Sequence, residues 1–96
     1  MYLLNVSYTK PADEVAPHIE SHSAWVKKYF AEGVFLMAGP KKSKLGGAIL
    51  VKSIGKDKLK QIIAEDSYIE ADVAEYQIID FDCKVAATGL ESLVTA

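Results

Sequence analysis

The order of two hydrophobic patterns along the chain limits its fold more than any other feature of the sequence. Short apolar runs, typical of strands, cover Tyr2–Tyr8, Val34–Pro40, Gly46–Val51 and Val73–Phe81. Apolar residues recur at the helical period in two other segments, Glu14–Phe30 and Lys56–Glu65, and the apolar stripe of the first consists of Val15, Ile19, Val26 and Phe30. The resulting order β-α-β-β-α-β predicts an α+β protein with the ferredoxin-like arrangement, in which both helices cover one face of an antiparallel sheet.

The second face of such a sheet needs a cover that this chain is too short to provide. A chain of 96 residues is expected to form a single domain, 1–96. We therefore expect a homodimer that packs two sheets face to face, and the sequence leaves higher assemblies open. In the C-terminal tail, residues 83–96, Leu90, Leu93 and Val94 are spaced as in a helix. We expect this tail to pack on its own body or on the partner.

Charge and cysteine content narrow the classes of partner. The chain has 11 basic residues, all of them lysine, and 13 acidic ones. Without arginine or a long basic run, nucleic acid is not expected as a partner; Lys41, Lys42 and Lys44 are typical of a solvated loop, the alternative being a contact with an anionic substrate group. The single Cys83 cannot form an intrachain disulfide. Because no apolar run reaches membrane-spanning length and no signal-peptide pattern is evident, we expect a cytoplasmic protein that binds no membrane.

Both histidines fall in the first predicted helix. On a helical wheel His22 lies in the apolar wedge between Val15 and Tyr29, so it points at the sheet. His18 and Trp25 lie at the margin of this wedge, where a polar tip reaches water. A buried imidazole needs hydrogen-bond partners. His22 is therefore either a core residue bonded to backbone or to Tyr29, or a functional residue that opens into a pocket.

The residues offer little support for a metal or for a phosphate-binding cofactor. His18 and His22 are four positions apart, but the intervening "IES" lacks the glutamate of an HExxH zinc helix, and no third ligand is nearby in the sequence. The paired glycines of "KLGGAIL" match neither glycine-rich phosphate-binding pattern and are expected to shape the entry to a strand. We therefore expect no metal site and no cofactor.

Two longer motifs closely resemble the YciI-like (YCII-related) family. The first is "HSAWVKKYFAEGVFLMAGP", a helical His followed at a fixed interval by Gly, an apolar strand and a Gly-Pro end. The second is "AEDSYIEADVAEYQIIDF", an acidic-aromatic turn followed by a small residue, Val and a last strand ending in Phe. The resemblance covers residues 2–82. It implies a ferredoxin-like fold, a dimeric α+β barrel and a pocket in which the helical His pairs with the Asp of the turn, here His22 and Asp66.

The turn is also where this chain departs from the family pattern. The family usually has Asp-Pro-aromatic, whereas this chain has Asp66-Ser67-Tyr68, so the stiffening proline is missing and the aspartate is kept. An aspartate beside an imidazole fixes the tautomer of the ring and favours its charged form, which suits a general acid or base near neutral pH. Ser67 has no assigned base and Cys83 follows the last strand, so no nucleophile for covalent catalysis is evident.

The resemblance implies a small enzyme in which His22 and Asp66 are catalytic and move a proton on a small organic molecule. Related proteins are associated with lyase or dehydrochlorinase-type elimination on ring compounds, and similar folds carry isomerisation. Two interpretations from other classes stay open, namely a non-catalytic dimeric module that binds a small ligand and a purely structural dimer. The candidate substrate-binding residues are Tyr8, Trp25, Gly39, Pro40, Ser67 and Tyr68.

Overall fold

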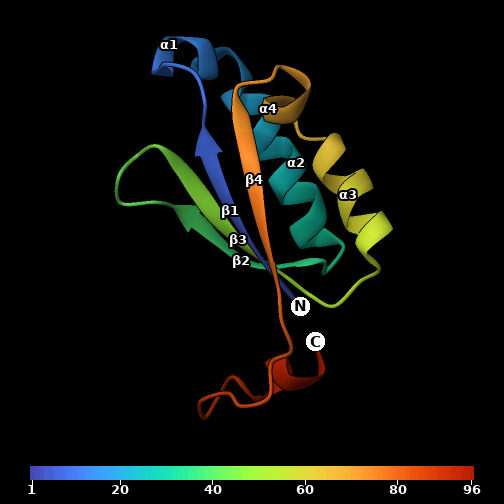
Figure 1. Cartoon of the computed structure of the whole chain (residues 1–96). Coiled ribbons are helices and arrows are strands. Elements are labelled where there is room, and N and C mark those ends of the chain that lie inside the picture. Colours follow the sequence, from blue (N-terminus) through green and yellow to red (C-terminus); the bar gives the residue numbers. More distant parts are fainter.

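The computed structural model describes residues 1–96, and at its centre is a sheet of four antiparallel strands (Figure 1). The strands are β1 (Tyr2–Tyr8), β2 (Phe35–Pro40), β3 (Gly46–Val51) and β4 (Ala74–Asp80). Their order across the sheet is β2-β3-β1-β4, which is the ferredoxin-like order. The predicted strands agree with the observed ones to within one residue at each end.

The predicted first helix is interrupted near its start. The structure has α1 (Ala12–Val15), a 3₁₀ turn η1 (Ala16–His18) and then α2 (Ile19–Ala31). Pro17 lies in the 3₁₀ turn; proline has no N–H to donate, and its ring disfavours a continuous α-helix through this point. The expectation of one unbroken helix over Glu14–Phe30 is therefore wrong at its N-terminal end.

The second predicted helix is confirmed as α3 (Lys56–Ala64), and a short further helix, α4 (Ser67–Glu70), follows it closely. We expected a turn at this second place. Asp66 is the N-cap of α4, because its backbone is extended and its side chain accepts a hydrogen bond from the Tyr68 N–H. This cap stabilises one helical turn where the sequence suggests only a bend.

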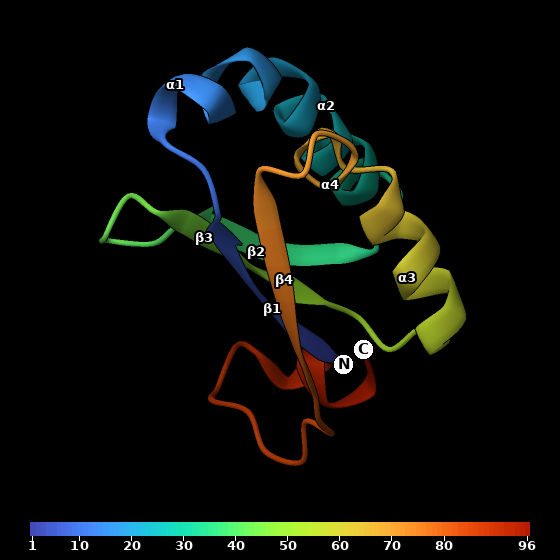
Figure 2. The same cartoon turned by 45° about the horizontal axis from the view of Figure 1, so that its top comes forward.

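Helices α2 and α3 lie on the same face of the sheet, as the element order predicts (Figure 2). Alternate residues of β1 point toward these helices, and Tyr2, Leu4 and Val6 are 5%, 0% and 3% exposed. Trp25 and Tyr29 of α2 pack into the same layer and are equally buried. This layer is the hydrophobic core that attaches the helices to the sheet.

The face that α2 buries differs from the predicted stripe. Ile19 and Phe30 belong to the predicted apolar face, yet they are 49% and 39% exposed, whereas Trp25, placed at the margin, is 6% exposed. The predicted stripe assumes an unbroken α-helix from Val15, in which each residue advances about 100° around the axis. In the 3₁₀ turn each residue advances about 120° instead. The phase of every later residue is shifted, and Trp25 is a core residue rather than one whose polar tip reaches water.

Gly46 marks a close approach between β3 and β1. Its φ is +143°, and a Cβ at this position would lie 1.9 Å from the carbonyl oxygen of Val6. Only glycine fits there, because the overlap is with backbone that the sheet holds in place. Gly46 pairs with Ser7 in the register between β1 and β3. The glycine thus lets β3 begin directly against β1.

The opposite face of the sheet carries no helix layer and is mixed in character. Met37 and Ile79 lie on this open face and are 60% and 53% exposed. Lys41 donates hydrogen bonds to Asn5 Oδ1 and to Ser7 Oγ, both at 3.0 Å, on the same face. Lys41 therefore packs on the sheet, whereas Lys42 and Lys44 are exposed, as expected for a solvated loop.

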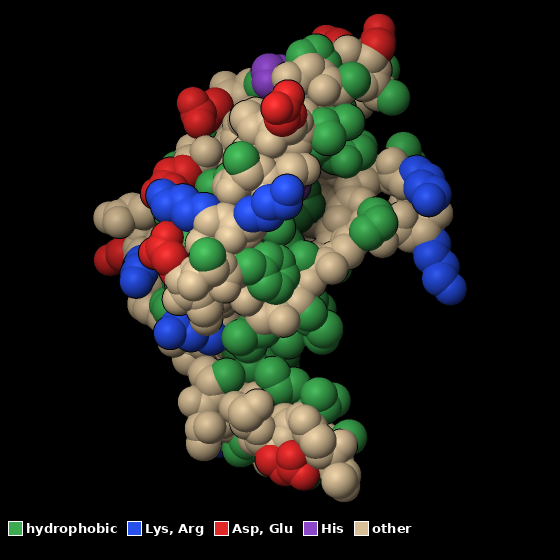
Figure 3. All heavy atoms as spheres, turned by 180° about the vertical axis from the view of Figure 1, so that it is seen from behind, with side chains coloured by type: hydrophobic (Ala, Val, Ile, Leu, Met, Phe, Trp, Pro, Cys, Tyr) green, Lys and Arg blue, Asp and Glu red, His purple; other side chains and the backbone are tan.

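Beyond β4 the chain continues as the tail, in which η2 (Glu91–Thr95) is a short 3₁₀ helix. Figure 2 shows the tail on the side of the sheet away from α1, α2 and α4. Seen from behind, hydrophobic side chains gather in a hollow between the projecting β2–β3 loop and the tail (Figure 3). None of the helices combines the length and the apolar character that crossing a membrane requires.

Candidate functional site

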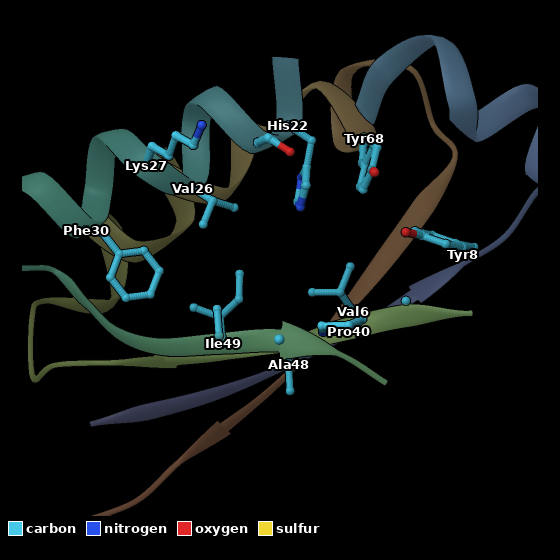
Figure 4. Close-up of a pocket in the computed structure, with 15 residues that line it drawn as sticks. Val6, Tyr8, His22, Val26, Lys27, Phe30, Pro40, Ala48, Ile49 and Tyr68 are labelled. Atoms are coloured by element: carbon cyan, nitrogen blue, oxygen red, sulfur yellow. The ribbon is translucent and has the colours of Figure 1, made fainter. Parts of the chain in front are cut away.

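A cavity of about 420 Å³ lies between α2 and the sheet (Figure 4). Val26 and Phe30 of α2 form one apolar wall, and Val6 and Ile49 of the strands form the other. Gly46 contributes backbone alone, which keeps the start of β3 free of side chains. Pockets for small organic ligands in proteins typically span about 300–1,000 Å³, so the cavity suits a small molecule.

His22 projects from α2 into this space. Its ring points toward the sheet (Figure 4), and its side chain is 19% exposed. Nδ1 lies 2.7 Å from Asp66 Oδ1, whereas no protein group bonds Nε2. The ring of Tyr68 stacks on the imidazole, with centroids 3.9 Å apart and planes 8° from parallel. One nitrogen of His22 is therefore held by the protein, and the other is left for the cavity that the ring borders.

Asp66 is the single buried charged residue of the chain, with 0% exposure. Three donors converge on its carboxylate. Oδ1 accepts from His22 and, at 3.1 Å, from the Tyr68 N–H. Oδ2 lies 2.5 Å from the hydroxyl of Tyr76, which donates to it. The N-cap position fixes the carboxylate against the backbone of α4, so the side chain that holds His22 is itself held from two other elements.

The tyrosines around Asp66 remain protonated at neutral pH. Burial raises the pKa of the Tyr76 hydroxyl, and its hydrogen bond to Asp66 and the charge of that carboxylate raise it further. Burial also raises the pKa of Tyr68, followed by hydrogen bonding with Tyr8 and by the charge of Asp66. Tyr76 is therefore a permanent donor to the carboxylate, and Tyr68 presents an uncharged ring to the imidazole.

Four of the predicted substrate-binding residues border the cavity. Tyr8 reaches it from the end of β1 and meets Tyr68 edge to face, with ring centroids 5.6 Å apart. Gly39 and Pro40 border it at the end of β2. The structure thus brings these residues together with His22 at one place, and their role in binding stays a prediction.

Ser67 and Trp25, the other two predicted substrate-binding residues, lie outside the cavity lining. Ser67 Oγ donates to the backbone carbonyl of His18 at 3.1 Å, which ties α4 to the end of η1. The indole N–H of Trp25 donates to the carbonyl of Ile62 at 2.9 Å inside the core. Trp25 packs behind the imidazole of His22, with ring centroids 5.5 Å apart, and so supports the ring from the core side.

Several residues of the site were not identified from the sequence. Tyr76, Val26 and Phe30 read as ordinary strand or helix residues, and Gly46 reads as a strand entry. Tyr76 reaches Asp66 because β4 pairs with β1 in a register that places Tyr76 opposite Val6, on the helix side of the sheet. The residues around Tyr76 do not indicate this register. The alternation of side chains along β4 indicates only that Tyr76 and Ile78 lie on the same face of the strand.

No three His, Cys, Asp or Glu side chains come together in a way that could hold a metal ion. His18 lies outside the cavity lining, and the only carboxylate bonded to His22 is that of Asp66. Cys83 lies in the tail, where its thiol contacts the carbonyl of Val85 at 3.5 Å. The polar side chains at the cavity are therefore the imidazole of His22, which is bonded to the buried carboxylate of Asp66, the hydroxyls of tyrosines and of Ser23, and the ammonium group of Lys27.

Comparison with known proteins finds a matching family and solved structures of similar fold. The family model of the YCII-related domain matches residues 1–82. The structure of 5-chloro-2-hydroxyhydroquinone dehydrochlorinase from Burkholderia phenoliruptrix AC1100, in complex with 2,5-dihydroxybenzoquinone, is similar with a TM-score of 0.67. The alignment has 13% sequence identity and covers 85% of this chain and 94% of that one, which shows a common fold. The sequence has no significant match among curated proteins.

Proposed function

The chain belongs to the YCII-related domain family, and we propose that His22 and Asp66 transfer a proton on a small organic molecule held in the cavity. One observation carries this proposal. The imidazole is bonded through Nδ1 to a fully buried carboxylate, at 2.7 Å, while Nε2 borders a cavity of about 420 Å³. A core histidine would have both nitrogens bonded to fixed protein groups and no adjoining space.

In the proposed mechanism Asp66 selects the tautomer of His22. Because the carboxylate accepts the Nδ1 proton, the lone pair of Nε2 faces the cavity and acts as a general base. When Nε2 takes a proton from the substrate, the imidazolium is stabilised by the charge of Asp66. In an isomerisation the same nitrogen returns the proton to another atom of the substrate as a general acid, whereas after an elimination it releases the proton to water. No hydroxyl or thiol is bonded to His22, so the pair does not activate a protein nucleophile.

The proposed reaction is an elimination or an isomerisation on a ring compound. The protein of similar fold from Burkholderia is a dehydrochlorinase whose complex contains a dihydroxybenzoquinone. In an elimination, Nε2 removes a proton, the electrons of that bond form a double bond, and the leaving group departs with its own electron pair. Apolar walls from α2 and the sheet suit the body of a ring. Tyr8 and Tyr68 offer hydroxyl groups to polar substituents at its edge.

A panel of chlorinated and unchlorinated hydroquinones tests this proposal. We expect chloride release or an absorbance change with at least one member, and a loss in His22→Asn of about 10²-fold or more in kcat/KM. His18→Asn is the matched control, because it makes the same change four residues earlier on a side chain outside the cavity lining, and it should keep the activity. Turnover that survives in His22→Asn would contradict the proposal.

The same panel distinguishes the alternative function, a module that binds a small ligand without converting it. NMR spectra of the labelled protein would then show shifts at Tyr8, His22 and Tyr68 with a panel member, while the ligand stays chemically unchanged. Such a result across the whole panel would favour the binding module over the enzyme.

We further propose that the working unit is a homodimer formed through the open face of the sheet, with the tail as part of the interface. The open face carries exposed Met37 and Ile79. Leu90 and Val94 of the tail are 52% and 43% exposed, and the tail lies at one side of the apolar hollow (Figure 3). Burying such exposed apolar surface stabilises a small domain. A second copy of the chain can bury it by packing its own open face against this one.

A further inference from the structure

Resting on the proposed function of the His22–Asp66 pair, we infer that Tyr76 is a positioning residue that holds Asp66 as an ionised, correctly oriented acceptor for His22. Tyr76 does not border the cavity. Its hydroxyl is bonded to Asp66 Oδ2, the carboxylate oxygen that His22 does not use. Tyr76 therefore acts on the proton transfer through Asp66 and does not touch the substrate.

The hydrogen bond from Tyr76 favours the charged form of Asp66. A fully buried carboxylate loses its hydration, and that loss favours the protonated form unless donors replace the water. Two of the three donors, His22 and the Tyr68 N–H, bond Oδ1. Tyr76 is the only donor to Oδ2. Without its hydroxyl, half of the carboxylate would be buried with no partner.

The same hydrogen bond also fixes the orientation of the Asp66 carboxylate. Asp66 and His22 lie on segments 44 residues apart, and each could turn about its side-chain torsions. The hydroxyl of Tyr76 pulls Oδ2 toward β4, which leaves Oδ1 facing α2 and His22. Tyr76 is itself fixed, because the ladder between β1 and β4 places it opposite Val6 and its ring packs against Trp25 at 6.4 Å between centroids. The sheet thus sets the geometry of a pair that lies between two helices.

The groups that face Asp66 are few, so the effect of removing one is well defined. They are His22 from α2, Tyr68 from α4 and Tyr76 from β4. Glu65, the neighbour in the chain, is turned to Tyr29, whose hydroxyl donates to it at 2.6 Å. No lysine is bonded to Asp66, so the hydroxyl of Tyr76 has no cationic substitute.

The test is an NMR titration of the His22 ring protons in wild type and in Tyr76→Phe. The hydrogen bond from Tyr76 stabilises the negative charge of Asp66 and so makes the His22–Asp66 pair less ready to take up a proton. Its loss should raise the pH midpoint at which the pair takes up a proton by about half a unit or more. Fluorotyrosine at position 76 keeps the bond with a more acidic donor, and should move the midpoint in the opposite direction even if Tyr76→Phe folds poorly.

Tyr2→Phe is the matched control, because it also removes a buried tyrosine hydroxyl, the one that donates to the carbonyl of Ile54 at 2.6 Å. It should cost stability and leave the midpoint unchanged. An unchanged or lowered midpoint in Tyr76→Phe, or an equal rise in Tyr2→Phe, would overturn the inference. Asp66→Asn distinguishes a failure of this inference from a failure of the proposed function. It should lower the pH midpoint of His22, because it removes the charge that stabilises the imidazolium. If the midpoint does not fall, His22 and Asp66 are not coupled, and the proposed function fails as well.

Discussion

At the scale of single residues, the site is defined by an asymmetry in how the protein bonds one imidazole. Nδ1 of His22 is bonded to a buried carboxylate, Nε2 is not bonded, and the ring stacks on Tyr68 and also packs near the core residue Trp25. The surroundings therefore fix the orientation of the ring and leave one nitrogen available. Mutation of His22 can therefore distinguish a functional imidazole from a core imidazole by its effect on stability.

His22→Asn should change the melting temperature little, in contrast to the replacement of a fully bonded core histidine. The asparagine amide nitrogen occupies a place near that of Nδ1 and can still donate to Asp66, so the carboxylate keeps its donors. For a core histidine, replacement would leave buried groups unpaired at a cost of about 1–3 kcal/mol. Thermal unfolding followed by circular dichroism measures the difference, and a loss in that range would favour the core role.

A second residue-scale prediction concerns Glu65. The hydrogen bond from Tyr29 lowers the pKa of Glu65 below its usual 4.5, burial opposes this, and the hydrogen bond and charge of Lys28 add to the lowering. A carboxyl with a lowered pKa in the folded state contributes stability above pH 4.5 that is lost as the pH falls through the lowered value. Tyr29→Phe should therefore reduce stability at pH 7 more than at pH 3.

Melting temperatures at the two pH values measure this difference. Tyr2→Phe again serves as the comparison, because its hydroxyl donates to a carbonyl and not to a carboxylate. Its loss of stability should be the same at both pH values. Equal losses at pH 7 and pH 3 in Tyr29→Phe would contradict the assignment of the lowered pKa to Tyr29.

At the scale of elements, the cavity depends on how closely β3 approaches β1. Gly46→Ala should destabilise the protein by about 2 kcal/mol or more, because a Cβ there would lie 1.9 Å from the Val6 carbonyl oxygen at a φ of +143°. Gly39→Ala is the comparison, since a Cβ at Gly39 meets nothing within 4 Å. Denaturant unfolding of the two variants measures the difference. Similar stabilities would show that the start of β3 can shift.

The tail gives a second element-scale prediction. It lies outside the family match over residues 1–82, and Val85, Leu90 and Val94 are 89%, 52% and 43% exposed. Exposed apolar residues at the end of a chain are typical of a segment that packs on a partner. Removing residues 89–96 should therefore weaken the dimer or lower the melting temperature. Sedimentation equilibrium and thermal unfolding test both, and no change in either would mean that the tail makes no stabilising contact.

At the scale of the whole molecule, the two faces of the sheet have different roles. The helix-bearing face contains the core and the cavity, and the open face exposes apolar side chains. Gel filtration with light scattering at micromolar concentration should give about twice the chain mass of 10.5 kDa. A clean monomer at that concentration would contradict the proposed assembly.

The face used for assembly can be tested with a matched pair of variants. Ile79→Lys places a charge on the open face, whereas Ile19→Lys does so on α2, and the two isoleucines are 53% and 49% exposed. Burial of an unpaired charge in an interface is costly, so Ile79→Lys should shift the protein toward monomer. Ile19→Lys should leave the assembly intact. A dimer that is equally stable in both variants would place the interface elsewhere.

The sequence by itself determined the elements that depend on local patterns. Periods of two and of 3.6 residues are properties of short segments, which is why the four strands and α3 were predicted within a residue. The order of these elements along the chain predicted the ferredoxin-like topology. The pairing of His22 with Asp66 came from resemblance, and the structure places the two side chains in contact at 2.7 Å.

Other features depend on the phase of a whole helical segment or on contacts between distant segments, and the tertiary structure decided them. The 3₁₀ turn at Pro17 rotated α2, so that Trp25 entered the core and Phe30 came to border the cavity. The register of β4 against β1 brought Tyr76 to Asp66. Helical phase accumulates over a segment and strand register is set by hydrogen bonds to a partner strand, so neither can be read from the residues around the position it controls.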